Sequence, residues 1–111
     1  MSPTSDAAPR AVLASFKPKA GQEDALLAVV LEHVPTLQRL GLATERPSLI
    51  MRAADGTLVE AFVWRSRADI DAAHKHPVVQ AMWQRFEAVC EYTSLKDLAE
   101  VQHPFAEFEL L

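Results

Sequence analysis

Three side chains with acid–base chemistry stand where the hydrophobic pattern expects apolar residues. One of them, Glu60, lies in the middle of an apolar run that alternates like a β-strand, on the same predicted face as Phe62 and Trp64. An ionised carboxylate on such a face is costly unless it has a partner, and burial suits it to proton transfer. We therefore interpret Glu60 either as a catalytic acid or base, or as half of a structural pair with a histidine or an arginine.

The other two, His33 and His74, hold comparable places on predicted helices. His33 falls inside the apolar stripe of the first helix, where a satisfied core histidine is the alternative, and His74 lies on the inward side of the second. With Glu60 they can converge on one cleft, as an acid–base cluster for a small acidic carbon compound or as a two-histidine, one-carboxylate metal site. No ligand spacing in the sequence supports the metal, so we expect no metal and no cofactor.

Four apolar side chains are expected to form the walls around these groups and to bind a small apolar ligand. They are the two tryptophans, whose indole N–H groups can also donate hydrogen bonds, and two apolar side chains on the predicted face of Glu60: Trp64, Trp83, Phe62 and Met51. Core packing is the alternative role for each tryptophan. His76 is expected to cap a helix at Pro77, and Cys90 to pack in the core.

The element that must carry His33 is a helix that follows a short strand. The apolar run 11–16 predicts a buried strand that ends before Pro18. Acidic residues at 23 and 24 open the helix, apolar residues continue at helical spacing to Leu40, and Gly41 ends it. Because Pro35 lies inside this pattern and lacks a backbone donor, we expect it to bend or split the helix near Leu31.

Glu60 belongs to a predicted hairpin that spans residues 47–66. Asp55-Gly56 is expected to form a two-residue type I′ turn, which would place Met51 opposite Glu60. The face of Glu60 would then carry Met51, and the opposite face would carry a second apolar set with one cation: Ile50, Arg52, Val59, Ala61 and Val63. Arg52 is expected to pair with an acid across a subunit interface.

The remaining elements complete an α+β pattern. Residues 66–69 predict a capping box for a short helix through Lys75, and His76-Pro77 separates it from a second segment whose inward stripe ends at Cys90. Residues 105–111 are expected to form a final edge strand. The order β-α-β-β-α-β predicts a ferredoxin-like sandwich, a four-stranded antiparallel sheet with helices on one face.

This arrangement leaves the second face of the sheet uncovered. That face would carry four apolar side chains: Ile50, Val59, Ala61 and Val63. Monomers rarely expose an apolar patch of several hundred Å², and its burial stabilises an assembly. We therefore predict a homodimer whose two sheets pack face to face around a two-fold axis.

Length, charge and cysteine content indicate the number of domains and the classes of partner and compartment to expect. A length of 111 residues suits one domain, here residues 10–111 after a flexible tail at 1–9. A net charge of −4 without a basic run disfavours nucleic-acid binding. One cysteine, no apolar run long enough to span a bilayer and no signal-like N-terminus indicate a cytoplasmic protein that does not associate with membranes.

Three groups of residues resemble the dimeric α+β-barrel superfamily, especially antibiotic-biosynthesis-monooxygenase-like proteins. They are residues 16–23 entering the first helix, residues 55–56 and 60–64 in the hairpin, and residues 73–74 and 77–83 in the second helical region. The resemblance implies a dimeric α+β barrel. It also implies an apolar pocket between helices and sheet, where the oxygenases of the family deprotonate a substrate that then reacts with oxygen without metal or flavin.

Two functions follow as expectations. The first is a cofactor-free oxygenase or a related enzyme acting on a small apolar or aromatic compound, with Glu60 or His33 as base and His74 as partner or proton shuttle. The second is a non-catalytic module that binds a small ligand or another protein. If the three polar groups only bond one another in a filled core, no pocket remains for chemistry. A solvent-reachable cleft beside them favours the enzyme.

Overall fold

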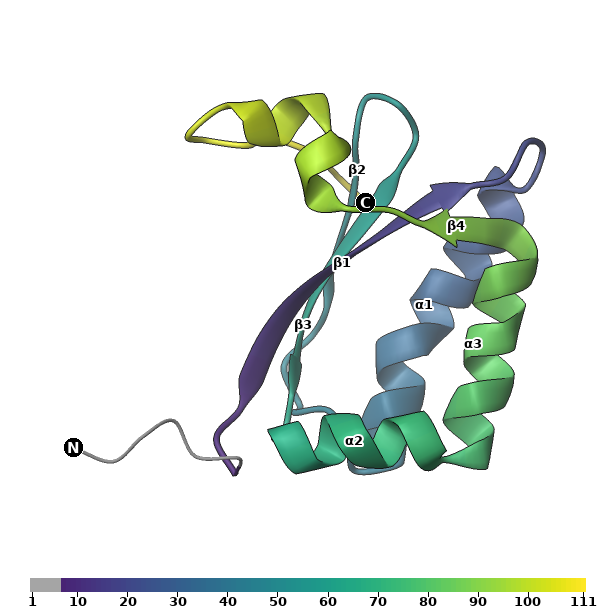
Figure 1. The fold of residues 1–111 in the computed structure, drawn as a ribbon, viewed down its shortest axis with the longest axis vertical. Coiled ribbons are helices and arrows are strands. Elements are labelled where there is room, and N and C mark those ends of the chain that lie inside the picture. Colours follow the sequence, from purple (N-terminus) through teal and green to yellow (C-terminus); the bar gives the residue numbers. More distant parts are fainter. Residues whose placement is uncertain (1–6) are drawn as a thin grey trace.

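The computed structural model describes residues 7–111, so most of the tail predicted at 1–9 lies outside the described residues. Within them the chain forms an α+β fold of three α-helices and one five-stranded antiparallel sheet with the strand order β4-β1-β3-β2-β5 (Figure 1). The elements are β1 (Arg10–Pro18), α1 (Glu23–Arg39), β2 (Leu49–Arg52), β3 (Leu58–Trp64), α2 (Arg67–Lys75), α3 (Pro77–Val89), β4 (Cys90–Tyr92), two 3₁₀ turns, η1 (Leu95–Asp97) and η2 (Ala99–Gln102), and β5 (Glu109–Leu110). None of the described helices is both long and apolar enough to cross a membrane.

The three helices lie on one side of the sheet (Figure 1). Their apolar stripes and the inward residues of β1 and β3 form the main core, in which Leu26, Leu37 and Phe86 are fully buried. This core fixes α1 and α3 side by side behind the long strands β1 and β3. The candidate functional site lies beside this core, between β1, α2 and α3.

The helix α1 runs without interruption through Pro35, so the predicted split near Leu31 is wrong. The proline removes one backbone donor, but the buried stripe on either side of it holds both halves against the sheet. The predicted stop is confirmed: Gly41 adopts φ +76°, and Leu42 N–H bonds back to the Leu37 carbonyl at 2.8 Å.

The caps of the next two helices are confirmed. The Ser66 hydroxyl accepts the Asp69 N–H at 3.0 Å and opens α2. His76 Nδ1 accepts the Val78 N–H at 3.1 Å and opens α3, directly before Pro77. The predicted interruption between the two helices therefore turns the chain, and it sets α2 across the end of α3 (Figure 1).

The fourth strand does not lie where the sequence pattern predicts it. The strand that pairs with β1 is β4, which starts at Cys90, a residue expected to end the helical stripe. The predicted edge strand at 105–111 contains only β5, and it pairs with β2 at the opposite edge of the sheet. The sheet therefore has five strands, and the expected four-stranded sandwich is corrected to a larger open sheet.

The hairpin register is one residue away from the prediction. Ile50, not Met51, pairs with Glu60, and Met51 pairs with Val59. The connection has three residues, because Ala53 N–H bonds to the Thr57 carbonyl at 2.8 Å and only Gly56 has a positive φ. Asp55 cannot be the first residue of a type I′ turn, and its carboxylate instead accepts the Thr57 N–H at 2.9 Å.

The second face of the sheet is partly covered by the chain itself. A segment that we call the C-terminal arm, residues 93–108, crosses to this side, where Leu98 packs over Val59 and Ala53. Val59 lies on the predicted face but is buried under the arm, and Ile50 belongs to the helix side, so its predicted face is wrong. The sheet residues that remain exposed include Leu13 and Leu49.

Candidate functional site

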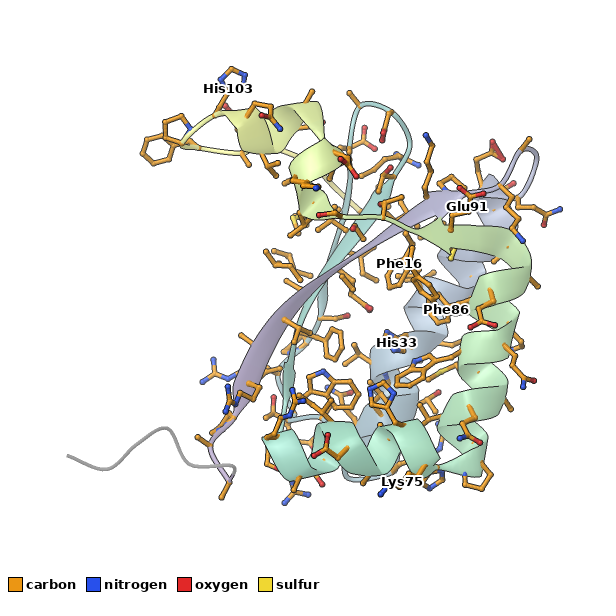
Figure 2. All side chains as sticks on the ribbon, viewed as in Figure 1. Phe16, His33, Lys75, Phe86, Glu91 and His103 are labelled. Atoms are coloured by element: carbon orange, nitrogen blue, oxygen red, sulfur yellow. The ribbon has the colours of Figure 1, made fainter. Side chains whose placement is uncertain are left out.

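A cleft of about 820 Å³ opens between β1, α2, α3 and the start of the C-terminal arm. We call it the sheet–helix cleft. Its walls are mainly aromatic and aliphatic: Val12, Phe16, Phe62, Trp64, Trp83 and Phe86. Figure 2 shows His33 beside Phe86 and Phe16, between the sheet and the helices, and its ring makes edge contacts with Phe16, Phe62 and Phe86. An apolar hollow of this size with a few polar groups is typical of a small-molecule site.

His33 and Glu60 form a buried pair at the floor of this cleft. His33 Nδ1 lies 2.7 Å from Glu60 Oε1, and the exposed fractions of the two residues are 4% and 0%. The helix α1 and the strand β3 thus bring together two residues that are 27 positions apart. His33 lines the cleft, whereas Glu60 lies behind it and is absent from its lining.

The second ring nitrogen of His33 is also engaged. The indole Nε1–H of Trp83, on α3, donates to His33 Nε2 at 3.1 Å. An indole N–H is only a donor, so Nε2 must offer its lone pair. A neutral imidazole then carries its proton on Nδ1 and donates it to Glu60. Trp83 and Glu60 together favour one tautomer of His33, which is protonated on Nδ1 and accepts the Trp83 indole N–H at Nε2.

Glu60 has one unused oxygen. Its Oε1 receives the His33 hydrogen bond, while Oε2 is buried and has no hydrogen-bond partner among the described residues. A buried carboxylate with a single hydrogen bond keeps much of its desolvation cost. The pair is therefore well placed to stabilise positive charge that appears on the imidazole, because an imidazolium beside Glu60 would compensate the carboxylate.

His74 lies at the rim of the cleft and not in the buried pair. It is exposed on α2, and its ring stands 5.1 Å from the ring of Trp83 in an edge arrangement. It contacts the pair through Trp83, so the three groups of the predicted cluster share one cleft but only two are bonded. In the part of the chain that the structure describes, no three His, Cys, Asp or Glu side chains gather as a metal site.

Three of the four predicted wall residues line the cleft. Trp64 and Phe62 are buried on the helix side of β3, with ring centroids 5.3 Å apart, and Trp83 forms the opposite wall. Met51 is the exception. The register shift turns it to the other face of the sheet, where it packs with the C-terminal arm, so it lies away from the cleft that it was expected to line.

Polar groups that the sequence interpretation missed stand at one end of the cleft. The Ser15 hydroxyl donates to the Thr93 carbonyl at 2.5 Å, and Tyr92 packs its ring 6.0 Å from Phe16. Burial raises the pKa of Tyr92 to about 12, so its phenol stays neutral. Burial also raises the pKa of the Cys90 thiol. These groups were not predicted because β4 was not predicted, since residues 90–92 are too few to show an alternating strand pattern.

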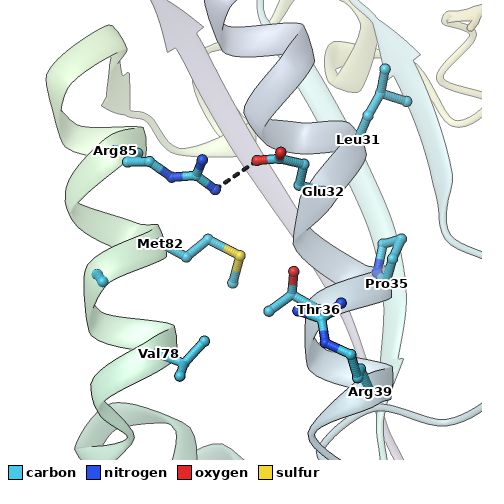
Figure 3. A pocket seen from close by; sticks show the side chains of 9 residues that line it. Leu31, Glu32, Pro35, Thr36, Arg39, Val78, Met82 and Arg85 are labelled. Atoms are coloured by element: carbon cyan, nitrogen blue, oxygen red, sulfur yellow. Dashed lines mark hydrogen bonds and ion pairs between the residues drawn. The ribbon is translucent and has the colours of Figure 1, made fainter.

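A second hollow lies on the outer surface between α1 and α3, and we call it the outer groove (Figure 3). Its volume is about 510 Å³, and it is bounded by Leu31, Pro35 and Val78. Arg85 on α3 reaches Glu32 on α1 at 2.6 Å across it. Arg52, expected to bind an acid of a second subunit, pairs instead with Glu109 of its own β5.

Comparison of this chain with known protein families, with curated proteins and with solved structures finds no match.

Proposed function

We propose that this protein is an enzyme that removes a proton from a small aromatic or enolic compound bound in the sheet–helix cleft, with His33 as the general base and Glu60 as its positioning partner. The observation that carries the proposal is the pair of contacts on the His33 ring. Nδ1 lies 2.7 Å from the buried Glu60 carboxylate, and Nε2 accepts the indole N–H of Trp83, which lines the same cleft as His33. A carboxylate–imidazole pair of this kind is the usual way to orient a histidine base.

The proton transfer follows from this geometry. The acidic O–H or C–H of the ligand gives its proton to His33 Nε2, and the electron pair of the broken bond stays on the ligand as an anion. The imidazolium that forms keeps its Nδ1–H bond to Glu60, whose negative charge stabilises it. The apolar walls exclude water and strengthen this interaction. Trp64 and Phe62 supply flat surfaces on which an aromatic ligand stacks.

We also propose kinship with the antibiotic-biosynthesis-monooxygenase-like proteins and, with it, molecular oxygen as the second substrate. The first four strands have the spatial order β4-β1-β3-β2, the helices lie on one side, and β5 is an addition at the edge. The segments that carry the resemblance contribute Phe16, Phe62, His74 and Trp83 to one cleft. The pockets of the oxygenases that this chain resembles commonly contain an asparagine, whereas this chain has none, so in this proposal the His33–Glu60 pair supplies the polar groups beside the pocket.

The test is turnover of weakly acidic aromatic compounds, such as anthrones and naphthols, followed by two independent signals. Exchange of the acidic carbon-bound proton in D₂O, monitored by NMR, reports proton removal, and an oxygen electrode reports oxidation. Substitution His33→Gln should lower both rates about a hundredfold or more, whereas His103→Gln, outside the cleft, should leave them unchanged. A His33→Gln variant with full exchange and full oxygen uptake would refute the base.

A ligand-binding module without catalysis is the second candidate. The observation that favours it is the hydrogen bond from Trp83, which occupies the lone pair of His33 Nε2. Calorimetry with the same aromatic compounds separates the two functions. Saturable binding without proton exchange at any pH supports the module, and exchange that depends on His33 supports the enzyme.

We further propose that a second copy covers the exposed part of the sheet. Leu13 on β1 is 57% exposed and Leu49 on β2 is 47% exposed, both on the side away from the helices. The matched test compares Leu13→Lys with Leu31→Lys, because Leu31 is equally exposed at 56% but lies on α1. Light scattering should show a dimer that only Leu13→Lys dissociates. A monomer of the unaltered chain at micromolar concentration would refute the dimer.

A further inference from the structure

The hydrogen bond from Trp83 to His33 places a protein donor where a ligand proton must arrive. His33 Nε2 has one lone pair, and Trp83 Nε1–H occupies it at 3.1 Å. Trp83 is half-buried on the cleft wall, with His74 against its ring. A ligand therefore reaches the base only by displacing the indole N–H.

We propose that Trp83 is a positioning residue that competes with the ligand for His33 Nε2, so that only neutral ligands carrying their own hydrogen-bond donor engage the base. This inference rests on the proposed function of the same cleft. A phenol or an enol replaces the indole N–H on His33 Nε2 by its own O–H, so the exchange conserves the number of hydrogen bonds. A ligand of the same shape with only acceptor atoms, such as an ether or a quinone, cannot make this exchange.

The charged groups at the cleft favour neutral ligands over anionic ones. Among the described residues that line it, there is no lysine or arginine, while Glu87 stands at its edge and Glu60 lies behind His33. An anionic ligand would meet two carboxylates and no lysine or arginine of the cleft lining. The ligand class that fits is a neutral aromatic or enolic O–H donor, which becomes an anion only after its proton has passed to His33.

The first experiment measures binding of a matched pair, 2-naphthol and 2-methoxynaphthalene, by calorimetry. The two probes share the ring system and differ in the O–H donor. In the unaltered protein the naphthol only exchanges its hydrogen bond for that of the indole, so the two probes should bind with affinities within about threefold of each other. In Trp83→Phe, which keeps a ring and lacks the donor, the naphthol gains one net hydrogen bond, so its affinity relative to the ether should rise by about threefold to tenfold.

The control is Trp64→Phe, because Trp64 lines the same cleft without a bond to His33. It should leave the ratio of the two affinities unchanged. An identical ratio in the unaltered protein and in Trp83→Phe would overturn the role of Trp83 while leaving ligand binding intact. Failure of both probes to bind would overturn the proposed function itself, and this inference with it.

The second experiment needs no variant. In ¹⁵N-resolved NMR spectra of the free protein, His33 should show a protonated Nδ1 and an unprotonated Nε2. Saturation with 2-naphthol should shift the indole N–H resonance of Trp83 toward the position of a group that has lost its acceptor, with little change at Trp64. A Trp83 indole resonance that does not move at saturation, or a His33 protonated on Nε2 in the free protein, would overturn the proposal.

Discussion

Two adjacent residues of α1, Glu32 and His33, make charge-bearing contacts of nearly equal length on opposite sides of the helix. His33 faces the sheet–helix cleft and lies 2.7 Å from Glu60, and Glu32 faces the outer groove and lies 2.6 Å from Arg85 (Figures 2 and 3). The side chains of the first pair are 6% and 0% exposed, and those of the second are 55% and 54% exposed. Distance does not distinguish the two pairs, whereas exposure to water does.

The difference in exposure determines how much each pair contributes to the free energy of unfolding. In the outer groove, water solvates both charges, so the pair contributes little and neither partner depends on the other. Behind the cleft, each member of the buried pair depends on the other for a hydrogen bond that water cannot replace. Of the two hollows, the sheet–helix cleft is the one with a buried polar pair beside it, so the proposed chemistry is assigned to that cleft.

The largest effect should come from Glu60→Ala. Removal of the carboxylate leaves His33 Nδ1–H without its acceptor and opens a cavity beside β3, so the free energy of unfolding should fall by about 3 to 5 kcal/mol. Urea denaturation followed by circular dichroism measures it. A loss below about 1 kcal/mol would mean that the pair is hydrated in solution, and the contrast between the two sides of α1 would disappear.

This buried pair was within reach of the sequence. Glu60 and His33 each interrupt an apolar pattern, and a charge placed in a core demands a partner, so their meeting follows from periodicity and desolvation. The contact from Trp83 was not predictable in the same way. It depends on the angle at which α3 leaves the turn at Pro77, which is set by packing of the whole domain.

The register of the hairpin shows where local rules fail. The dipeptide Asp55-Gly56 fits both a two-residue and a three-residue connection, and the choice depends on one left-handed residue, Gly56. Because side chains alternate, the shift of one residue moved Met51 to the opposite face and Ile50 to the helix side. Similarly, the C-terminal arm has no helical or strand period, so nothing local indicated that it covers Val59.

The second prediction removes both partners of the buried pair. His33→Leu alone leaves the Glu60 carboxylate buried without a hydrogen bond and should cost about 3 kcal/mol. The double variant His33→Leu with Glu60→Leu fills the space with apolar groups, and its stability should return to within about 1 kcal/mol of the unaltered protein. Denaturant midpoints of the unaltered protein, the two single leucine variants and the double variant give the interaction free energy of the two side chains. Additive losses would show that the two side chains do not act as a pair.

The third prediction tests whether another titratable group of the cleft contributes to proton transfer. Because burial raises the pKa of Tyr92 to about 12, its phenol is neutral below about pH 10, so under the proposed function Tyr92→Phe should leave the pH dependence of turnover in that range unchanged. The effect of pH on stability is opposite to that of a carboxylate whose folded-state pKa is lowered by a partner. The unfolded chain releases the phenol proton near the ordinary value of 10, and the folded chain holds it to about 12.

Stability of the unaltered protein should therefore decline as pH rises through this interval, and Tyr92→Phe should decline less. Thermal melting at pH 8 and above pH 10 provides the comparison. A turnover profile whose alkaline limb moves in Tyr92→Phe would assign the phenol a part in catalysis and would weaken the assignment of His33 as the single base.

The smallest effect is expected in the outer groove. Glu32→Gln removes the partner of Arg85, but both side chains are more than half exposed, so the free energy of unfolding should change by less than about 0.5 kcal/mol, and less still at high salt. Turnover should be unchanged, because His33 keeps its contacts on the other side of α1. The matched variant Arg85→Gln should give the same small change. If either variant lowered stability or turnover as far as Glu60→Ala does, then α1 would transmit the loss of a surface pair to the cleft. In that case exposure would not be what separates the two sides of the helix.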